Sequence, residues 1–312
     1  MKEKILITGG LGNLGSWLTA HFARNNFEVW VLSLQERKLT ENIDYNFLQC
    51  DISDFKDCQK KLMDHTFEYI IHTASVNDDF IENYFHSAIL VNGLGTRNLL
   101  ELFKCKPIKH FIYISTFQVY GTYAGTITED TPVNPRNDYS NTHLFAEFYI
   151  KQFNQIHGLP YTIIRLTNGY GCPKDYFSSK WYLTLNSLTK KAFEEKQIIL
   201  TSNGNALRDF IWMGDVCKVL QKLVEKAASN TTYNLSGEKT LTLKQVAHLV
   251  LEAYKEKYNE EIPIIINTKD TTVYNNSLFV SSSKLMRLLP YQPDCRLMEE
   301  AKSIFNFLEQ KC

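Results

Sequence analysis

The chain of 312 residues is longer than the size at which one hydrophobic core usually stops growing, so we expect one large domain or two unequal ones. Hydrophobic residues make up 44% of it and charged residues 22%, a composition typical of globular proteins and not of disordered ones. Lys plus Arg and Asp plus Glu both number 34, and this balance argues against a nucleic-acid-binding protein, which normally carries a basic excess.

The N-terminal segment MKEKILITGG passes from charged residues directly into a short strand and a glycine turn. A signal peptide would need a longer apolar region and a cleavage site, and a membrane span would need roughly 20 apolar residues. The seven cysteines are scattered without a CxxC pair, which favours free thiols over a disulfide framework or a zinc site. We therefore expect a soluble cytoplasmic protein with no membrane attachment and no metal.

Short runs rich in β-branched and aromatic residues alternate with helical patterns through the first half of the chain. The predicted strands are 4–9, 28–33, 46–51, 69–74, 110–116 and 161–166. Their nearly continuous apolar character indicates strands that are covered on both faces, as in a parallel sheet. With helical patterns at 15–26 and 90–105 between them, they predict a doubly wound α/β domain that binds ligands at the strands' carboxyl ends.

The pattern changes after about residue 168, where a polar, turn-rich stretch begins. The later elements predicted are helices at 181–195, 242–257 and 297–310 and a strand at 262–266. We expect a larger domain over 1–167 with about 205–235, and a smaller cap over about 168–204 and 236–312 that is interleaved with it.

The stretch ITGGLGNLGSWL places Gly9, Gly12 and Gly15 three apart, between the first strand and the first helix. Such a turn lets bare backbone approach a pyrophosphate, while the helix N-terminus presents its free N–H groups. A tight turn that binds nothing is the alternative. The position after a strand and before an amphipathic helix favours a dinucleotide site.

A dinucleotide site commonly has an acidic residue at the end of the second strand, bonded to the adenosine ribose. Ser33 stands there, followed by LQERK. Arg37 and Lys38 would suit a 2′-phosphate and hence NADP, whereas Glu36 opposes it, so these residues leave NAD and NADP both open. Asp51, at the end of the third strand, is placed either to meet the adenine or to serve as an ordinary turn acid.

Small residues end the fourth strand at His72–Ser75, as is needed where backbone passes beside a cofactor. Asn92 lies in the following helix, and a buried Asn has to find partners, so we expect it to brace a neighbouring strand. Ser115 and Thr116 end the fifth strand at the same edge. Their hydroxyls either bond a substrate oxygen or satisfy local backbone.

Tyr139 and His143 stand four residues apart in the helical stretch DYSNTHLFAE, which places them on one face of the helix. They form either a reactive tyrosine with its partner or a buried stripe.

Together these motifs resemble the extended short-chain dehydrogenase/reductase family of nucleotide-sugar epimerases, dehydratases and reductases. The resemblance spans nearly the whole chain, from TGGLGNLG at its start through IHTAS, NGLGTRNLLE and ISTFQVYG. It continues through RLTNGYG, RDFIWMGDV and YNLSGEKTLTLKQVA. It implies a Rossmann-like sheet with a smaller substrate domain, a nucleotide-sugar substrate and a homodimer or homotetramer.

The resemblance also assigns roles. It implies that Tyr139 is the catalytic acid and base, that Thr116 is the active-site hydroxyl, and that Asn168 and Arg208 hold the substrate's diphosphate or nucleotide. Arg suits that role because its planar fork binds phosphate oxygens in pairs. The implied cofactor-binding residues are Gly9, Gly12, Asn13, Leu14, Gly15, Ser33, Asp51, Ile52, Thr73, Ala74, Ser75, Asn92, Tyr139 and His143.

The chain departs from the family at His143, where the motif Tyr-x-x-x-Lys has its lysine. A histidine is mostly neutral at pH 7, so it can bond the nicotinamide ribose but lowers the pKa of the tyrosine less than a lysine does. Either the charge of the oxidised nicotinamide carries more of the activation, or turnover is slow, or the chain is inactive.

Phe117 and Gln118 follow Thr116, where the family's dehydratases have an Asp-Glu pair, so we expect no dehydration. Hydride transfer at a sugar carbon, most often C4, remains. His143 and HLFAE resemble proteins of bacterial surface-polysaccharide pathways, with a faint match to a nucleotide-heptose 4-dehydrogenase of capsule synthesis. This match favours NAD and a 4-dehydrogenase. The alternatives are a 4-epimerase, a 4-keto reductase, a non-catalytic NAD(P)-binding regulator and a protein-binding scaffold.

Overall fold

The computed structural model describes residues 2–76, 83–175, 180–275 and 277–310. The chain divides into two compact units, and each is built from three segments. Unit 1 comprises Met1–Thr122, Thr131–Leu166 and Cys217–Asn234. Unit 2 comprises Tyr123–Asp130, Thr167–Val216 and Leu235–Cys312.

Unit 1 is organised around a seven-stranded sheet in the order β11-β7-β5-β4-β1-β2-β3. The strands are β1 (Lys4–Thr8), β2 (Glu28–Ser33), β3 (Asn46–Gln49), β4 (Tyr69–His72), β5 (His110–Thr116), β7 (Tyr161–Leu166) and β11 (Thr231–Leu235). From β7 to β3, neighbouring strands pair in parallel. The Rossmann-like doubly wound fold predicted from the sequence is confirmed.

The strand order reverses between β1 and β4, which are neighbours in the sheet although β2 and β3 separate them in the chain. Ligands of open α/β sheets bind outside the carboxyl ends of the strands at such a reversal. Gly9 follows β1 and Thr73 follows β4, so both lie at this point.

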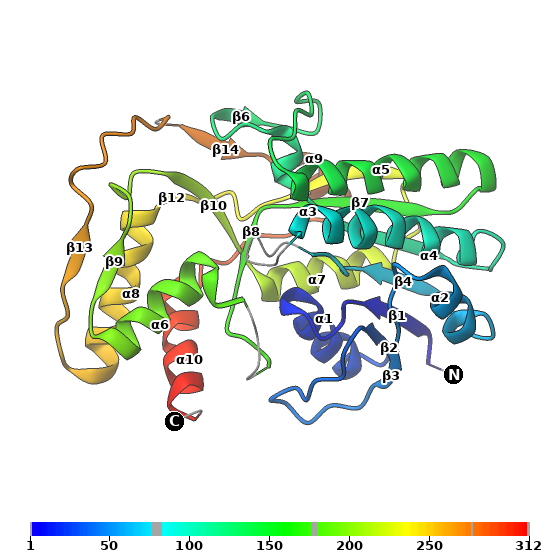
Figure 1. Ribbon diagram of the computed structural model, residues 1–312, viewed down its shortest axis with the longest axis horizontal. Coiled ribbons are helices and arrows are strands. Elements are labelled where there is room, and N and C mark those ends of the chain that lie inside the picture. The colour runs from blue at the N-terminus through cyan, green and yellow to red at the C-terminus, as the bar shows by residue number, and fades with distance from the viewer. Residues whose placement is uncertain (1, 77–82, 176–179, 276, 311–312) are drawn as a thin grey trace. The chain divides into compact units, whose positions relative to one another are not determined.

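Helices cover both faces of this sheet (Figure 1). On one face lie α2 (Phe55–Leu62), α4 (Thr96–Phe103) and α5 (Asp138–His157), whose buried Leu100, Phe103 and Ile150 share a core with strand residues such as Phe111. On the other face lie α1 (Asn13–Arg24) and α7 (Met213–Val224), which a 2.6 Å hydrogen bond joins between His21 Nε2 and Gln221 Oε1. Both faces are therefore buried, as the apolar strands required.

Two further helical segments, α3 (Tyr84–Ala88) and η1 (Ile89–Gly95), lead into α4. The segment η1 is a π-helix, so the predicted helix at 90–105 is wider at its start than a regular α-helix. Between β5 and α5 lies η2 (Phe117–Tyr120), a 3₁₀ turn.

Unit 2 has its own core. Its helices α6 (Thr184–Glu195), α8 (Leu243–Tyr258) and α10 (Leu297–Glu309) pack together through residues such as Leu185, Val250, Tyr254 and Phe305. Its strands form the sheet β12-β10-β8 and the pairs β13-β9 and β14-β6. These strands and the remaining helices are β6 (Gly125–Ile127), β8 (Asn168–Tyr170), β9 (Ile198–Leu200), β10 (Leu207–Trp212), β12 (Thr240–Thr242), β13 (Ile264–Ile266), β14 (Leu278–Val280), η3 (Lys180–Tyr182) and α9 (Ser283–Leu288).

The segment 205–216 was expected in the larger domain but lies in unit 2. The reason is strand pairing, because β10 pairs with β8 and β12, which both belong to unit 2. Residues 123–130 also join unit 2, since β6 pairs with β14. The assignment of cofactor binding to one unit and substrate binding to the other stays a proposal.

No helix in the described part of the chain is long and apolar enough to cross a membrane. Within the same residues, no group of three or more His, Cys, Asp and Glu side chains is placed to hold a metal ion.

Candidate active site

The glycine turn between β1 and α1 contains glycines that the backbone itself requires. Gly9 has φ of +66°, and a Cβ on it would lie 2.7 Å from the Cα of Ala74. A Cβ on Gly15 would lie only 2.0 Å from the carbonyl oxygen of Gly9. Gly12 is different, because its Cβ would meet only that same oxygen, at 3.0 Å. The chain therefore excludes side chains at Gly9 and Gly15, while Gly12 is exposed and leaves its backbone open to a ligand.

The N-terminus of α1 is built to receive an anion. Gly12 is its N-cap, no described side chain caps it, and its first turn contains no acidic residue. The partial positive charge of the helix end is thus not neutralised by the described protein. Beside it, Asn13 Oδ1 is buried and has no hydrogen-bond partner among the described residues, and Leu14 is half-buried. The uncapped helix end fits the pyrophosphate of a dinucleotide, whereas the Asn13 oxygen, an acceptor, fits a hydrogen-bond donor.

Ser33 and Asp51 end β2 and follow β3, at the same edge of the sheet. The carbonyl of Ser33 accepts from Cys50 N at 3.1 Å, which fixes the ends of the two strands together. Asp51 Oδ1 accepts from the backbone N and the hydroxyl of Ser53, at 2.9 and 2.7 Å. The alternative of a turn acid is therefore realised for Asp51, and its contact with adenine stays a proposal. Ile52 is buried, and a Cβ on Gly95 would lie 2.8 Å from its Cδ1.

Asn92 braces the segment that follows β4. Its Oδ1 accepts from Val76 N at 2.7 Å, and its Nδ2 donates to Val76 O at 3.1 Å and to Thr142 Oγ1 at 3.0 Å. Thr142 in turn donates to the carbonyl of Tyr139 at 3.0 Å. Asn92 thus connects the strand end to the first turn of α5, as its expected bracing role required.

The small residues of that segment approach the glycine turn closely. Thr73 Oγ1 donates to the carbonyl of Thr8 at 2.7 Å, and Ala74 N donates to Thr8 Oγ1 at 3.4 Å. Ser75 is exposed. The segment after β4 is therefore joined to the end of β1, and Thr73–Ser75 lie at the edge of the sheet at which a cofactor would bind.

Tyr139 lies in the first turn of α5, whose start is fixed by Asn137. The side chain of Asn137 accepts from Ser140 N at 2.8 Å in a capping box. Thr116, at the end of β5, hydrogen-bonds the Tyr139 hydroxyl. Burial raises the pKa of Tyr139 to about 12, and the bond with Thr116 lowers it. The predicted Thr116–Tyr139 pair is thus assembled, with the tyrosine as a neutral phenol.

His143 lies one turn further along α5, beside Tyr139. The two rings meet edge to face with centroids 4.5 Å apart. His143 Nδ1 lies 2.7 Å from the hydroxyl of Tyr113 on β5, and His143 Nε2 is buried without a partner among the described residues. Burial lowers the pKa of His143 to about 3, so the imidazole is neutral near pH 7 and brings no positive charge to Tyr139.

Asn168 and Arg208 lie on neighbouring strands of unit 2. Asn168 on β8 pairs with Phe210 on β10, and its Nδ2 donates to the carbonyl of Asp209 at 2.8 Å. The guanidinium of Arg208 lies 5.0 Å from the ring centroid of Tyr123 and donates to the carbonyl of Leu207 at 2.8 Å. The structure brings this predicted pair to one small sheet, and its role towards a substrate stays a proposal.

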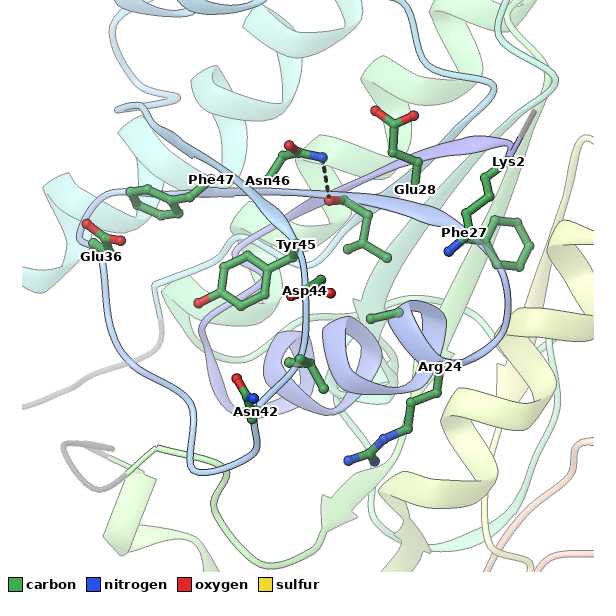
Figure 2. Close-up of a pocket in the computed structure, with 13 residues that line it drawn as sticks. Lys2, Arg24, Phe27, Glu28, Glu36, Asn42, Asp44, Tyr45, Asn46 and Phe47 are labelled. Atoms are coloured by element: carbon green, nitrogen blue, oxygen red, sulfur yellow. Dashed lines mark hydrogen bonds between the residues drawn. The ribbon is translucent and has the colours of Figure 1, made fainter.

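A hollow of about 650 Å³ lies on another part of unit 1 (Figure 2). It is lined by Lys2, the end of α1, the start of β2, Glu36 and the segment 42–47. Neither the glycine turn nor Thr116, Tyr139 or His143 lines it. The hollow is therefore distinct from the site built around Tyr139.

Two contributors to the site were missed in the sequence. Tyr113 was interpreted only as part of an apolar strand, although a buried tyrosine hydroxyl needs a partner and so signals one. Thr142 stands between Tyr139 and His143 in the sequence, and no motif marks it as a site residue. Its partner Asn92 lies 50 residues away in the chain, so local spacing could not reveal the contact.

The fold and the glycine turn together define a Rossmann-type dinucleotide-binding protein. The chain belongs to the NAD dependent epimerase/dehydratase family, whose model matches residues 5–236. The resemblance to extended short-chain dehydrogenases/reductases is thereby confirmed.

The chain is 27% identical to a putative UDP-glucose 4-epimerase of Methanocaldococcus jannaschii, with 98% of each chain covered. It is 26% identical to a dTDP-glucose 4,6-dehydratase of Neisseria meningitidis, with 93% of this chain and 89% of the relative covered. Relatives at this level therefore include both epimerases and dehydratases.

The fold is also similar to solved structures. A UDP-glucuronic acid 4-epimerase from Bacillus cereus, in complex with NAD, superposes with a TM-score of 0.81 at 21% identity and with 99% of each chain covered. A UDP-glucose 4-epimerase from Thermotoga maritima with UDP-glucose gives a TM-score of 0.82 at 22% identity, again with 99% of each chain covered. At these identities the likeness establishes the fold.

Proposed function

We propose that the protein catalyses NAD-dependent hydride transfer at C4 of a nucleotide sugar, with Tyr139 exchanging a proton with the sugar hydroxyl. The observation that carries this proposal is the hydrogen-bonded pair of Thr116 and Tyr139 beside His143, at the carboxyl edge of the sheet. Membership of an NAD-dependent family and the names of the relatives support it.

The residues present fit NAD. Gly9, Gly12 and Gly15 leave room for a pyrophosphate at the open end of α1. Asn13 Oδ1 and His143 Nε2 are buried polar atoms without partners among the described residues, as expected of atoms that bond a ligand. We assign the adenosine end to Ser33 and Asp51 and the nicotinamide end to Thr73–Ser75 and His143. Glu36 disfavours a 2′-phosphate, so NAD is preferred to NADP.

In the reductive direction, Tyr139 donates its proton to a sugar ketone, a task suited to a neutral phenol with a pKa of about 12. In the oxidative direction it has to accept a proton, and at pH 7 only about one molecule in 10⁵ holds a phenolate with this pKa. Thr116 donates a hydrogen bond that stabilises the phenolate, and neutral His143 adds no charge. When bound, oxidised NAD supplies the hydride acceptor and a positive charge.

The residues after Thr116 disfavour dehydration. Phe117 is buried, and Gln118 Oε1 accepts from Asn137 Nδ2 at 3.2 Å. Neither side chain can act as an acid or a base, so water elimination lacks its proton donor and acceptor. We therefore do not propose dehydration, although a dTDP-glucose 4,6-dehydratase is among the relatives.

Net oxidation as a 4-dehydrogenase, in the synthesis of a bacterial surface polysaccharide such as a capsule, is our first assignment. A 4-epimerase is the second candidate, because the Methanocaldococcus relative and the similar Thermotoga structure carry that name. The high pKa of Tyr139 and the neutral His143 also favour a third reading, a non-catalytic NAD-binding regulator.

The test incubates the protein and NAD with UDP-, dTDP-, GDP- and CDP-sugars that carry deuterium at C4. A dehydrogenase transfers the deuterium to the nicotinamide and accumulates absorbance of reduced cofactor. An epimerase returns the deuterium to C4 of the inverted sugar. A dehydratase releases a sugar lighter by one water, which would contradict the proposal, and bound NAD without any turnover identifies the regulator.

Self-association as a homodimer or homotetramer also stays a proposal. It is supported by large apolar side chains exposed on unit 1, among them Phe85, Ile89 and Phe148, with 54%, 51% and 56% of their surface accessible. Light scattering coupled to size exclusion measures the mass directly, and a monomer at micromolar concentration would contradict it.

A further inference from the structure

We propose that Tyr113 is a positioning residue that keeps the proton of the His143 imidazole on Nε2, so that His143 is a hydrogen-bond donor to a ribose hydroxyl oxygen of the bound dinucleotide. This inference rests on the proposed function for its ligand.

The hydroxyl of Tyr113 and Nδ1 of His143, 2.7 Å apart, are each other's partners. Both side chains are only 2% exposed. Burial raises the pKa of Tyr113 well above its usual value, so the phenol keeps its proton and has it to donate. A neutral imidazole has one donor nitrogen and one acceptor nitrogen.

Two arrangements of the protons are possible, and they differ in how many groups remain unpaired. If Tyr113 donates to Nδ1, the imidazole proton sits on Nε2, and only this N–H lacks a partner among the described residues. If Nδ1 donates to Tyr113, then the phenol proton and the Nε2 lone pair both lack a hydrogen-bond partner among the described residues. Each buried unpaired group costs about 1–3 kcal/mol, so the first arrangement is favoured.

The neighbouring rings of His72 and Tyr139 do not provide a partner for His143 Nε2. The His72 ring lies beside that of Tyr113, with ring centroids 5.4 Å apart, but both of its nitrogens have hydrogen-bond partners. Its Nδ1 lies 2.5 Å from Thr8 Oγ1 and its Nε2 lies 2.9 Å from Thr96 Oγ1. Tyr139 bonds Thr116. Among the described residues, the hydrogen-bond donor of this cluster that lacks a partner is therefore the Nε2–H of His143, and it can donate to an oxygen of a ligand.

His143 can thus present a donor without a charge. The tautomer set by Tyr113 supplies the hydrogen-bond donor that the lysine of the Tyr-x-x-x-Lys motif would supply, but it does not supply the positive charge of that lysine. Tyr113 does not need to touch the ligand itself, because it acts through the imidazole.

Two other histidines provide internal references for a test. His110 Nδ1 lies 3.1 Å from the carbonyl of Leu223, which can only accept, so His110 carries its proton on Nδ1. His72 Nε2 faces Thr96 Oγ1, whose own proton is donated to the Asn92 carbonyl at 2.6 Å. His72 therefore carries its proton on Nε2. Both tautomers are thus represented in the same molecule.

The experiment is a two-bond ¹H–¹⁵N correlation spectrum of protein labelled with ¹⁵N-histidine, at pH 7 and without NAD. The His143 signals are assigned by their loss in His143→Gln. We expect His143 to show the pattern of His72, with Nδ1 as acceptor. In Tyr113→Phe the Nδ1 resonance of His143 should shift and both tautomers become populated, while His72 and His110 stay unchanged. A His143 pattern like that of His110 in the wild type overturns the proposal.

A titration with NAD gives the second readout. Tyr113→Phe should weaken affinity about 2- to 10-fold, the worth of one hydrogen bond. Tyr120→Phe, which removes a buried 2.7 Å bond to Asn234, is the matched control and should leave affinity unchanged. In a His143→Gln background, whose amide needs no tautomer selection, Tyr113→Phe should add nothing. Equal losses in both backgrounds overturn the positioning role, and a wild type without NAD affinity overturns the proposed function while leaving the tautomer measurement decisive for Tyr113.

Discussion

The carboxylate of Glu147 accepts two hydrogen bonds from the guanidinium of Arg165, from Nε at 3.0 Å and from a terminal nitrogen at 2.7 Å. The side chains are 0% and 6% exposed, and the hydroxyl of Ser115 donates to the same carboxylate at 2.7 Å. This ion pair joins α5 to β5 and β7, one turn after His143. It therefore anchors the helix that carries Tyr139 to the strands beneath it.

Replacing Glu147 by Gln should destabilise the protein by about 3–5 kcal/mol, because it leaves the Arg165 charge buried without a counter-charge. Urea unfolding followed by circular dichroism measures the loss. Glu3→Gln is the matched control, since Glu3 pairs with Lys109 at an exposed site, and it should cost less than about 1 kcal/mol. Equal effects of the two substitutions would show that the buried pair contributes no more than the exposed one.

Replacing Tyr139 by Phe should lower kcat on the true substrate by roughly 10²- to 10⁴-fold, the usual worth of a positioned acid–base group. NAD affinity should remain. Because the pKa of Tyr139 is raised to about 12, the oxidative rate of the wild type should increase with pH as the phenolate fraction grows. A pH profile of kcat for both proteins checks this, and full activity of the variant refutes the mechanism.

The glycine turn predicts a contrast between two positions. Gly12→Val should abolish NAD binding, because the side chain would occupy the space of the pyrophosphate. The protein should stay folded, because a Cβ there meets only one backbone oxygen, at 3.0 Å. Gly15→Ala should destabilise the protein as well, since its Cβ would lie 2.0 Å from Gly9 O. Calorimetric titration and thermal unfolding separate the two effects. Unchanged affinity in Gly12→Val would remove the pyrophosphate assignment.

Replacing Arg208 by Ala should weaken binding of a nucleoside diphosphate about 10- to 100-fold, as expected for lost charge-assisted hydrogen bonds. Affinity for NAD should change little. Arg208→Lys keeps the charge but not the planar fork, so it should fall between wild type and Ala. Parallel loss of both affinities would instead show that Arg208 supports the fold, through its contact with Tyr123.

Asp209 predicts a pH dependence of stability. Burial raises the pKa of its carboxyl from 3.8 to about 6, although hydrogen bonds from Thr167 and Gly237 lower it. A raised pKa means that the folded state binds the proton more tightly. Protonation of Asp209 therefore contributes about 3 kcal/mol to stability below pH 4, and this contribution is lost as the pH rises through 6. The difference in unfolding free energy between wild type and Asp209→Asn should change by about 2–3 kcal/mol from pH 4 to 7, and a constant difference would contradict the prediction.

Local patterns predicted the parts of the site that depend on short spacing. The glycine turn and the shared helix face of Tyr139 and His143 follow from intervals of three and four residues, and both are present. The Asp51–Ser53 turn has the same local character. The Asp-x-Ser spacing itself favours a turn acid, because Asp side chains hydrogen-bond the backbone two residues on.

Contacts between elements could not be predicted in this way. Tyr113 and His143 are 30 residues apart, and their meeting depends on how α5 packs on β5. The pairing of β10 with β8 and β12 could not be predicted for the same reason, because the sequence of one strand does not reveal which strands lie beside it. Periodicity identifies a strand, whereas pairing is decided by the whole chain.

The interleaving of the two units has a consequence for synthesis on the ribosome. The strand β11 lies at the edge of the seven-stranded sheet beside β7, but the segment Thr167–Val216, which belongs to unit 2, is translated between them. At 5–20 residues per second, β7 therefore waits on the order of several seconds for its neighbour. During this time a largely apolar strand has an unpaired edge, the kind of surface on which nascent chains associate with one another. Fragments that end between β7 and β11 should accordingly be aggregation-prone, and the protein should be sensitive to chaperone supply while it is being made.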